Sequence, residues 1–212
     1  MAQEGNTGFD GRLERHVSKD VAWHPSQVGA ADRAQFLRQQ PATVWLTGFS
    51  GSGKSTIAFE LERQLMAGGH LVYVLDGDNI RHGLSRDLGF SPTDRTENIR
   101  RIAEVAKLFN DAGLIVITAF ISPYREDRSL AREIIGAGRF VETHLCTAID
   151  VCEGRDPKGL YRKARDGAIA EFTGVSAPYE APEAAALRLD TGRMTLAQCV
   201  TQIVDQLSSR FF

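Results

Sequence analysis

The sequence predicts a single α/β domain in which helices cover both faces of a parallel β-sheet. Three observations point to this fold class. Short apolar runs rich in β-branched residues recur along the chain, the stronger runs are bounded by Gly or Asp, and amphipathic helical patterns separate them. A length of 212 residues with 42% hydrophobic residues is sufficient for one core that needs no disulfides or structural metal.

The elements alternate along the chain after residue 40. Residues 1–40 show no strong periodicity and are expected to form an arm or a lead-in helix, which places the domain at 41–212. Helices are expected after the glycine-rich loop that follows the first strand, over residues 95–112 behind Asp94, and at the C-terminus behind a capping box of Thr195 and Gln198. The strands are expected at Thr43–Thr47, Leu71–Leu75 and Leu114–Ala119, with weaker ones at Arg139–Cys146 and Ala186–Leu189.

Composition argues against several classes of partner. The net charge is −2, so a general nucleic-acid-binding surface is not expected. No apolar run approaches the ~20 residues needed to span a bilayer, and the polar N-terminus lacks the apolar region of a secretory signal. The three cysteines, Cys146, Cys152 and Cys199, are too irregularly spaced for a metal knuckle or a disulfide framework. We therefore expect a cytoplasmic protein with free thiols and no membrane partner.

A phosphate-binding loop directly follows the first strand. Residues 48–56 read GFSGSGKST, which fits the pattern G-x-x-x-x-G-K-S and is followed by an apolar helical pattern. The backbone N–H groups of such a loop surround phosphate oxygens, the lysine reaches the β- and γ-phosphates, and the serine hydroxyl binds Mg²⁺. The sequence thus predicts a nucleoside triphosphate site on a P-loop NTPase-type sheet, formed by Gly48, Phe49, Ser50, Gly51, Ser52, Gly53, Lys54, Ser55 and Thr56.

The loop alone fits kinases, switch GTPases and ATP-driven machines. No N-K-x-D guanine-reading motif occurs, which disfavours switch GTPases, and the third strand ends without the usual acidic residue. Asp76 and Asp78 follow the end of the second strand, where open parallel sheets bind ligands. One carboxylate could hold Mg²⁺ through water while the other accepts the proton of an acceptor hydroxyl. A turn with two solvated acids is the alternative interpretation.

Basic and aromatic residues follow the acid pair. Five arginines, of which we expect two to bind anions, occur at Arg81, Arg86, Arg95, Arg100 and Arg101. Phe90 lies among them in a Gly-Phe-Ser turn, where stacking on a base and packing in the core are equally open. Ser122 precedes a proline at the end of the third strand, on the expected rim of the site.

Residues 154–182 are expected to form a lid. The segment is rich in Gly, Pro and charge and has little periodicity, as is typical of long functional loops. It also contains a second isolated aromatic residue, Phe172. Its cations could close over phosphates and exclude water, although a solvated basic loop is the alternative. These cations are Arg155, Lys158, Arg162, Lys163 and Arg165.

With these motifs, the chain resembles the adenylylsulfate kinase family, whose members phosphorylate the 3′-hydroxyl of adenosine 5′-phosphosulfate with MgATP. The resemblance extends from about Asp20 to the C-terminus. It is specific as a set of motifs: VAWHP, GFSGSGKST, DGDNIRHGL, LGFSPTDRTENIRR, FISPYREDR, DPKGLYRKAR and FTGVSAPYEAPE.

The resemblance implies a role for each matching residue. Asp78 would be the general base and Asp76 a metal-site residue, while Lys158, together with Arg155 at the nucleotide, would belong to the closing lid. Ser122 matches the serine proposed in this family as a phosphorylated intermediate. Phe90 and Phe172 would sandwich the acceptor adenine, and the remaining acceptor ligands would be Arg81, Arg95, Asn98, Ile121 and Ser122. The family further implies a homodimer, and association or fusion with ATP sulfurylase is left open.

Two alternatives remain open from the sequence. Another small-acceptor kinase, of nucleoside or shikimate type, would share the loop and the lid. A non-catalytic nucleotide-binding module within a sulfate-activating complex is the second, and the intact loop and acid pair argue against it. For the chemistry we favour direct in-line transfer with Asp78 as the base over a phosphoserine relay through Ser122, because the nearest candidate bases for Ser122, Glu126 and Asp127, lie at an expected helix start.

Overall fold

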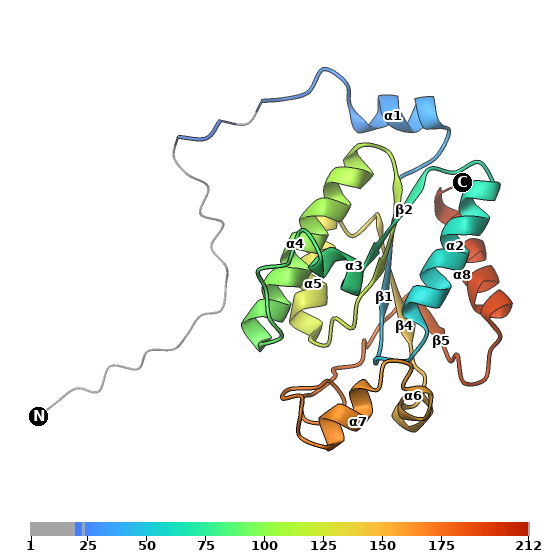
Figure 1. Ribbon diagram of the computed structural model, residues 1–212. Helices are drawn as coiled ribbons and strands as arrows, with labels where there is room; N and C mark the ends of the chain where they lie inside the picture. Colours follow the sequence, from blue (N-terminus) through green and yellow to red (C-terminus); the bar gives the residue numbers. More distant parts are fainter. Residues whose placement is uncertain (1–19, 23, 212) are drawn as a thin grey trace, which may run out of the picture.

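One parallel β-sheet runs through the centre of the domain. The structure is a computed structural model that describes residues 20–22 and 24–211. Its five-stranded sheet has the order β2-β3-β1-β4-β5, and every neighbouring pair is parallel (Figure 1). The predicted parallel sheet is confirmed, and each expected strand end is right to within one residue. The strands are β1 (Thr43–Thr47), β2 (Val72–Asp76), β3 (Ile115–Ala119), β4 (Phe140–Leu145) and β5 (Leu187–Leu189).

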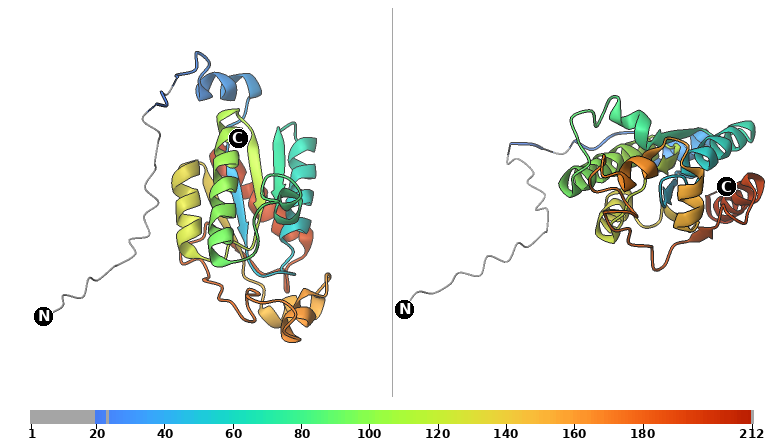
Figure 2. Two further views of the ribbon diagram at one scale, coloured as in Figure 1. Left: turned by 60° about the vertical axis from the view of Figure 1, so that its left-hand side comes forward. Right: turned by 60° about the horizontal axis from the view of Figure 1, so that its bottom comes forward.

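Helices cover both faces of this sheet, as predicted. Helices α2 (Lys54–Ala67) and α8 (Leu196–Phe211) pack together on one face, and α4 (Pro92–Asp111) and α5 (Arg125–Ile135) pack on the other (Figures 1 and 2). The alternation of side chains along β1 separates the two cores, because Val44 and Leu46 join the cluster under α2 and α8 while Trp45 joins the cluster under α4 and α5. All three side chains are fully buried.

Helix α4 begins earlier than expected. The predicted start at residue 95 is wrong by one turn, because Ser91 is the N-cap and its hydroxyl accepts a hydrogen bond from the Asp94 N–H at 3.2 Å. Pro92 occupies the first helical position, where its fixed φ angle suits the helix and its missing N–H is not needed. Asp94 therefore lies inside the first turn, and α4 projects one further turn towards the carboxyl ends of the strands.

The part of residues 1–40 that the structure describes contains one helix, α1 (Ala30–Leu37). After it, the buried side-chain amide of Gln39 donates hydrogen bonds to the Leu71 and Gly113 carbonyls, which attaches the segment before β1 to the amino ends of β2 and β3. Residues 1–19, which form most of the expected arm, lie outside the described residues. Among the described helices, none is both long enough and apolar enough to cross a membrane.

Residues 154–182, which the sequence predicts to form a lid, are a folded segment with a small core. It contains the end of α6 (Ile149–Arg155), the helix α7 (Leu160–Arg165) and a bridge between Thr173 and Ala177. It lies across the carboxyl ends of the strands (Figures 1 and 2). Helix α7 is too short for its apolar residues to show a helical period in the sequence. The apolar side chains of the lid pack together with Phe49 of the phosphate loop. The resulting third core contains Cys152, Tyr161, Ala164 and Phe172, with Phe49, Ile149, Leu160, Ile169 and Val175 packed against it.

A glycine lies where the lid meets the loop, and it yields a prediction. Gly174 has a φ of +90°, and a Cβ there would lie 2.7 Å from Ile149 Cδ1 and 2.9 Å from Phe49 Cε1. Gly167 has a φ of +74° but no atom within 4 Å of such a Cβ. Both alanine variants carry the same left-handed backbone cost, of about 1–2 kcal/mol, so only Gly174→Ala should also push the lid away from the loop. We expect trypsin to cut the lid faster in Gly174→Ala than in Gly167→Ala; equal rates would contradict this packing.

Candidate functional site

A large cavity lies at the carboxyl ends of the strands, beneath the lid. Its volume is about 1150 Å³. The phosphate loop, the residues after β2 and β3, the start of α4 and the lid all contribute to its wall. Most predicted site residues line it, whereas Gly48, Phe49 and Ser52 lie outside its lining. The predicted residues that line it are Ser50, Gly51, Gly53, Lys54, Ser55, Thr56, Asp76, Asp78, Arg81, Phe90, Arg95, Asn98, Ile121, Ser122, Arg155, Lys158 and Phe172.

Lys54 is buried at the floor of the phosphate loop. Its ammonium group donates hydrogen bonds to the carbonyl oxygens of Gly48 at 2.9 Å and Phe49 at 2.7 Å. Burial lowers the pKa of Lys54 to about 8, and the nearby Asp76 carboxylate opposes that shift. A phosphate group in the cavity would favour the charged form of Lys54 in the same way. The position thus suits a side chain that binds anionic oxygen.

The remaining carbonyls of the loop are held from outside it. Tyr161 Oη donates to the Ser50 carbonyl at 2.9 Å, and Arg155 Nη1 donates to the Gly51 carbonyl at 3.1 Å. Thr191 Oγ1 donates to the Ser52 carbonyl at 2.9 Å. Sequence reasoning missed Tyr161 and Thr191. Thr191 follows β5, so the rule that singled out the strand ends at Asp76 and Ser122 could have found it, whereas nothing in the lid sequence distinguished Tyr161.

The two acids occupy different environments. Asp76 is buried; its Oδ2 accepts a hydrogen bond from Ser55 Oγ at 2.6 Å, and its Oδ1 caps the short helix α3 (Gly77–Arg81) through the Asp78 and Asn79 N–H groups. Asp78 is exposed and forms an ion pair with Lys158 of the lid. Asp76 and Gly77 therefore begin a capped helix, and the alternative of two solvated acids in a turn does not hold for Asp76.

Arg81 and Arg95, which the resemblance assigns to the acceptor, donate mainly to backbone carbonyls. The Arg81 guanidinium lies 4.3 Å from the Phe90 ring centre and donates to the Leu88 and Gly89 carbonyls. Arg95 donates to the Phe90 carbonyl, the Glu171 carbonyl and Thr173 Oγ1. Arg95 therefore joins the segment of Phe90 to the segment of Phe172. Of the other expected arginines, Arg100 and Arg101 form ion pairs with Glu97, and Arg86 does not line the cavity.

The two isolated aromatic residues differ in exposure although both line the cavity. Phe90 is 63% exposed and Phe172 is 8% exposed. The Phe172 ring meets the edge of Tyr161, with ring centres 4.9 Å apart. Between the two segments, Asn98 is buried and its Oδ1 has no hydrogen-bond partner among the described residues. Asn98 lines the cavity, and a buried acceptor without a partner beside a cavity calls for an explanation such as a bound ligand.

Ser122 is held in a strained conformation. Its φ is +40°, which is uncommon for a residue other than glycine, and its hydroxyl oxygen accepts a hydrogen bond from Trp45 Nε1 at 3.2 Å. The Ser122 carbonyl accepts a hydrogen bond from Arg128 Nη1 at 2.6 Å. Arg128 is only 3% exposed and also binds Glu142 Oε1 and the Glu180 carbonyl. Sequence reasoning missed this arginine, which connects the loop after β3, at Ser122, to the end of the lid, at Glu180. We call the loop at Ser122 the acceptor-side loop.

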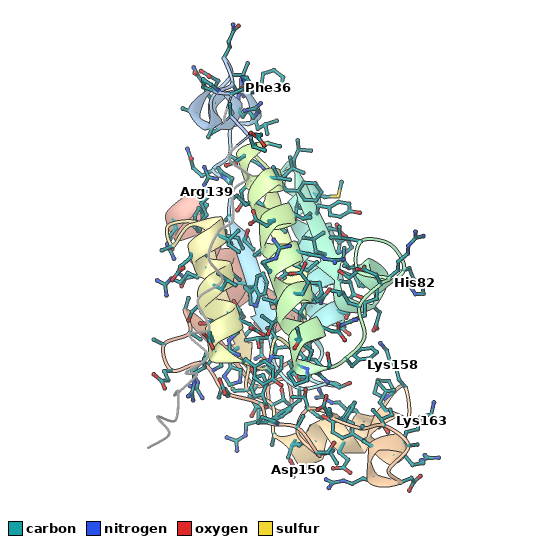
Figure 3. The ribbon with its side chains drawn as sticks, turned by 90° about the vertical axis from the view of Figure 1, so that its left-hand side faces the viewer. Phe36, His82, Arg139, Asp150, Lys158 and Lys163 are labelled. Atoms are coloured by element: carbon teal, nitrogen blue, oxygen red, sulfur yellow. The ribbon has the colours of Figure 1, made fainter. Side chains whose placement is uncertain are left out.

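Two of the five lid cations reach the cavity. Arg155 contacts the phosphate loop, and Lys158 lies where the lid meets the rest of the domain (Figure 3). Arg165 pairs with Glu153 on the outer side of the lid, and neither Arg162 nor Lys163 lines the cavity. Arg162, Lys163 and Arg165 therefore fit the alternative interpretation, a solvated basic loop. Arg155 and Lys158 line the cavity, as expected of cations in a lid that closes over phosphates.

Comparison with known proteins identifies the family. A family model described as adenylylsulphate kinase matches residues 40–190. An adenylyl-sulfate kinase from Shewanella pealeana is 54% identical over 190 residues, which cover 90% of this chain and 93% of the relative. The Mycobacterium tuberculosis APS kinase CysC, solved in complex with AMPPNP and APS, is 48% identical with a TM-score of 0.77, over 80% of this chain and 98% of that one.

A third relative is a longer protein. The hexameric APS kinase from Thiobacillus denitrificans is 35% identical with a TM-score of 0.62, and the match covers 84% of this chain but 31% of that one. The resemblance drawn from the motifs is thus confirmed over most of the sequence, and so is the parallel P-loop kinase architecture. On these grounds the chain belongs to the adenylylsulphate kinase family.

Proposed function

We propose that this chain is an ATP-dependent kinase that transfers the γ-phosphoryl group of ATP to the 3′-hydroxyl of adenosine 5′-phosphosulfate. The products are 3′-phosphoadenylylsulfate and ADP, which places the reaction in sulfate activation. The observation that carries this proposal is the make-up of one cavity, which is lined by a phosphate loop, two acids and two aromatic rings whose backbone segments Arg95 connects. The solved relative that holds AMPPNP and APS together supports the same pair of nucleotides here.

The donor nucleotide is assigned to the phosphate loop. Its N–H groups and Lys54 would bind the β- and γ-phosphates, and Arg155, which lies beside Gly51 and Thr191, would contact the nucleotide from the lid. Ser55 Oγ and Asp76 Oδ2 lie 2.6 Å apart, and this pair of hard oxygen donors fits Mg²⁺, which keeps waters and phosphate oxygens as its other ligands. When bound, Mg²⁺ would neutralise charge on the phosphates.

The acceptor is assigned to the opposite end of the cavity. Phe90 and Phe172 would stack on the two faces of its adenine, since each aromatic face offers a sequence-tolerant stacking platform. Arg81 and Arg95 donate most of their hydrogen bonds to backbone carbonyls, which positions the segments of the two rings. The remaining N–H groups of these arginines would face the phosphosulfate. Asn98 Oδ1 and the backbone at Ile121 and Ser122 would complete the pocket.

Asp78 is assigned as the base for the 3′-hydroxyl. The proton passes to its carboxylate as the 3′-oxygen forms a bond to the γ-phosphorus and the bond from that phosphorus to the β–γ bridging oxygen breaks, which releases ADP. Lys158 occupies Asp78 Oδ2 in the structure. A phosphate or sulfate group in the cavity offers Lys158 a second anionic partner, and movement of its exposed side chain to that partner would free Asp78 to accept the proton.

Direct transfer suits the surroundings of Ser122 better than a phosphoserine relay. The hydroxyl group is buried against Trp45, and no carboxylate among the described residues accepts a hydrogen bond from it. A phosphoryl group on this oxygen would have to displace the indole N–H and fit beside a strained backbone that Arg128 already fixes. We therefore assign Ser122 to acceptor binding.

The assembly of the protein forms a further part of the proposal. We infer that the chain forms a homodimer. Association or fusion with ATP sulfurylase is compatible with this proposal. A hexameric relative whose chain is longer than this one shows that a member of the family self-associates. The described cysteines, Cys146, Cys152 and Cys199, are all free thiols, which supports a reducing cytoplasmic setting.

A panel of acceptors tests the function. With MgATP, we expect stoichiometric ADP formation with adenosine 5′-phosphosulfate and none with nucleosides or shikimate. Turnover of another small acceptor in place of adenosine 5′-phosphosulfate would assign the chain to a different kinase activity. Nucleotide binding without transfer to any acceptor would instead support the non-catalytic binding module.

Two substitutions separate direct transfer from the relay. Asp78→Asn removes the base and should lower kcat about 100-fold, the usual scale for loss of a general base. Ser122→Ala should retain much of the wild-type kcat, because in direct transfer the hydroxyl only shapes the pocket. Rapid-quench kinetics of both variants check this ranking, and a chiral γ-phosphate shows the stereochemistry. The opposite ranking, together with net retention at phosphorus, would establish the phosphoserine route.

A further inference from the structure

Tyr161 contacts two residues that line the cavity, Ser50 of the phosphate loop and Phe172 of the lid, although it does not line the cavity itself. It lies on helix α7 of the lid, is 1% exposed, and donates from its hydroxyl to the Ser50 carbonyl of the phosphate loop at 2.9 Å. The edge of the same ring packs on Phe172, with ring centres 4.9 Å apart and an interplanar angle of 76°. We propose that Tyr161 is a positioning residue through which nucleotide binding and acceptor binding strengthen each other. This inference rests on the proposed function, which assigns the loop to ATP and Phe172 to the acceptor.

The contact with the loop orients a phosphate donor. In a trans peptide the C=O of one residue and the N–H of the next point in opposite directions, so the bond to the Ser50 carbonyl also aims the Gly51 N–H. That N–H points away from Tyr161, and it has no hydrogen-bond partner among the described residues. Gly51 lines the cavity and has a φ of +76°, a conformation in which loop N–H groups form an anion-binding concavity.

The contact with Phe172 reaches the acceptor end. Arg95 contacts both neighbours of Phe172, through the Glu171 carbonyl and Thr173 Oγ1, and the buried Phe172 ring packs against Tyr161. An adenine stacked on Phe172 would therefore also restrict Tyr161. Phosphate on the loop would restrict it from the other side by holding the Ser50–Gly51 peptide. Since both ligands favour the same arrangement, their coupling is positive, and it must be reciprocal.

The position of Tyr161 is well defined without either ligand. Its N–H donates to Asp156 Oδ1 at 3.1 Å, and its ring lies in the third core with Cys152 and Ala164. Burial raises the pKa of Tyr161, so the hydroxyl keeps its proton and remains a donor at any physiological pH. Removal of the hydroxyl alone would leave the ring packing intact, which makes Tyr161→Phe a suitable probe of the single hydrogen bond.

Titration calorimetry tests the coupling in the full-length protein with Mg²⁺ present. The dissociation constant of AMPPNP is measured with and without saturating adenosine 5′-phosphosulfate, and the ratio of the two is the coupling factor. We expect adenosine 5′-phosphosulfate to tighten AMPPNP binding in the wild type. Tyr161→Phe should reduce that factor about fivefold, the typical effect of one net hydrogen bond, while the affinity for adenosine 5′-phosphosulfate alone changes less than about twofold. Tyr73→Phe is the matched control, because Tyr73 is half-exposed on β2, packs against Phe109 and does not line the cavity, so its variant should keep the wild-type factor.

Three outcomes would overturn the proposal: a wild-type coupling factor of one, an unchanged factor in Tyr161→Phe, or an equal loss in Tyr73→Phe. A melting temperature of Tyr161→Phe within a few degrees of the wild type excludes general unfolding of the lid as the cause. Failure of the proposed function would look different, because the wild type would then not convert adenosine 5′-phosphosulfate. If the wild type converts adenosine 5′-phosphosulfate but the coupling factor is unchanged in Tyr161→Phe, then the kinase activity stands and Tyr161 does not couple the two sites.

Discussion

The carbonyl oxygens of the phosphate loop impose the constraint on which the rest of the site depends. A loop whose N–H groups surround an anion must turn its carbonyl groups elsewhere, and a buried carbonyl without a donor costs about 1–3 kcal/mol. Here Lys54 donates hydrogen bonds to the Gly48 and Phe49 carbonyls. The carbonyls of the next three residues, 50–52, each accept a hydrogen bond from a different side chain. Those donors are Tyr161, Arg155 and Thr191. The phosphate loop is therefore completed by side chains from the lid, from α6 and from the segment after β5.

This dependence explains why the lid is folded around the loop. Two of the three outside donors belong to residues 154–182, and Phe49 of the loop packs into the lid's own small core. Arg128 attaches the far end of the same segment to the acceptor-side loop through the Glu180 and Ser122 carbonyls. Both substrate ends of the cavity thus share one set of supports, so a change at the lid affects donor and acceptor together.

Sequence reasoning reached the sheet, the loop and the acid pair because each leaves a local pattern. The strands show as β-branched runs, and the loop needs glycines at fixed spacing, so these features could be predicted to within a residue. The packing of the lid could not be predicted. Its apolar residues, such as Tyr161 and Ile169, show no period, and their burial depends on Phe49, which lies more than a hundred positions away. Composition likewise could not show that Arg81 and Arg95 bind backbone carbonyls, because an arginine cluster looks the same whether it faces an anion or a turn.

Hydrogen–deuterium exchange of the ligand-free protein tests the central claim, that the lid is folded against the phosphate loop before any substrate binds. The amide N–H groups of Lys163 and Asp166 donate within or at the end of α7, and that of Gly174 donates to the Ala177 carbonyl. We predict that these amides exchange at least tenfold more slowly than an unstructured chain, and that Gly174→Ala removes this protection. Exchange at the unstructured rate across residues 156–177 of the wild type would contradict the claim, since the Ser50 carbonyl would then lack its donor Tyr161.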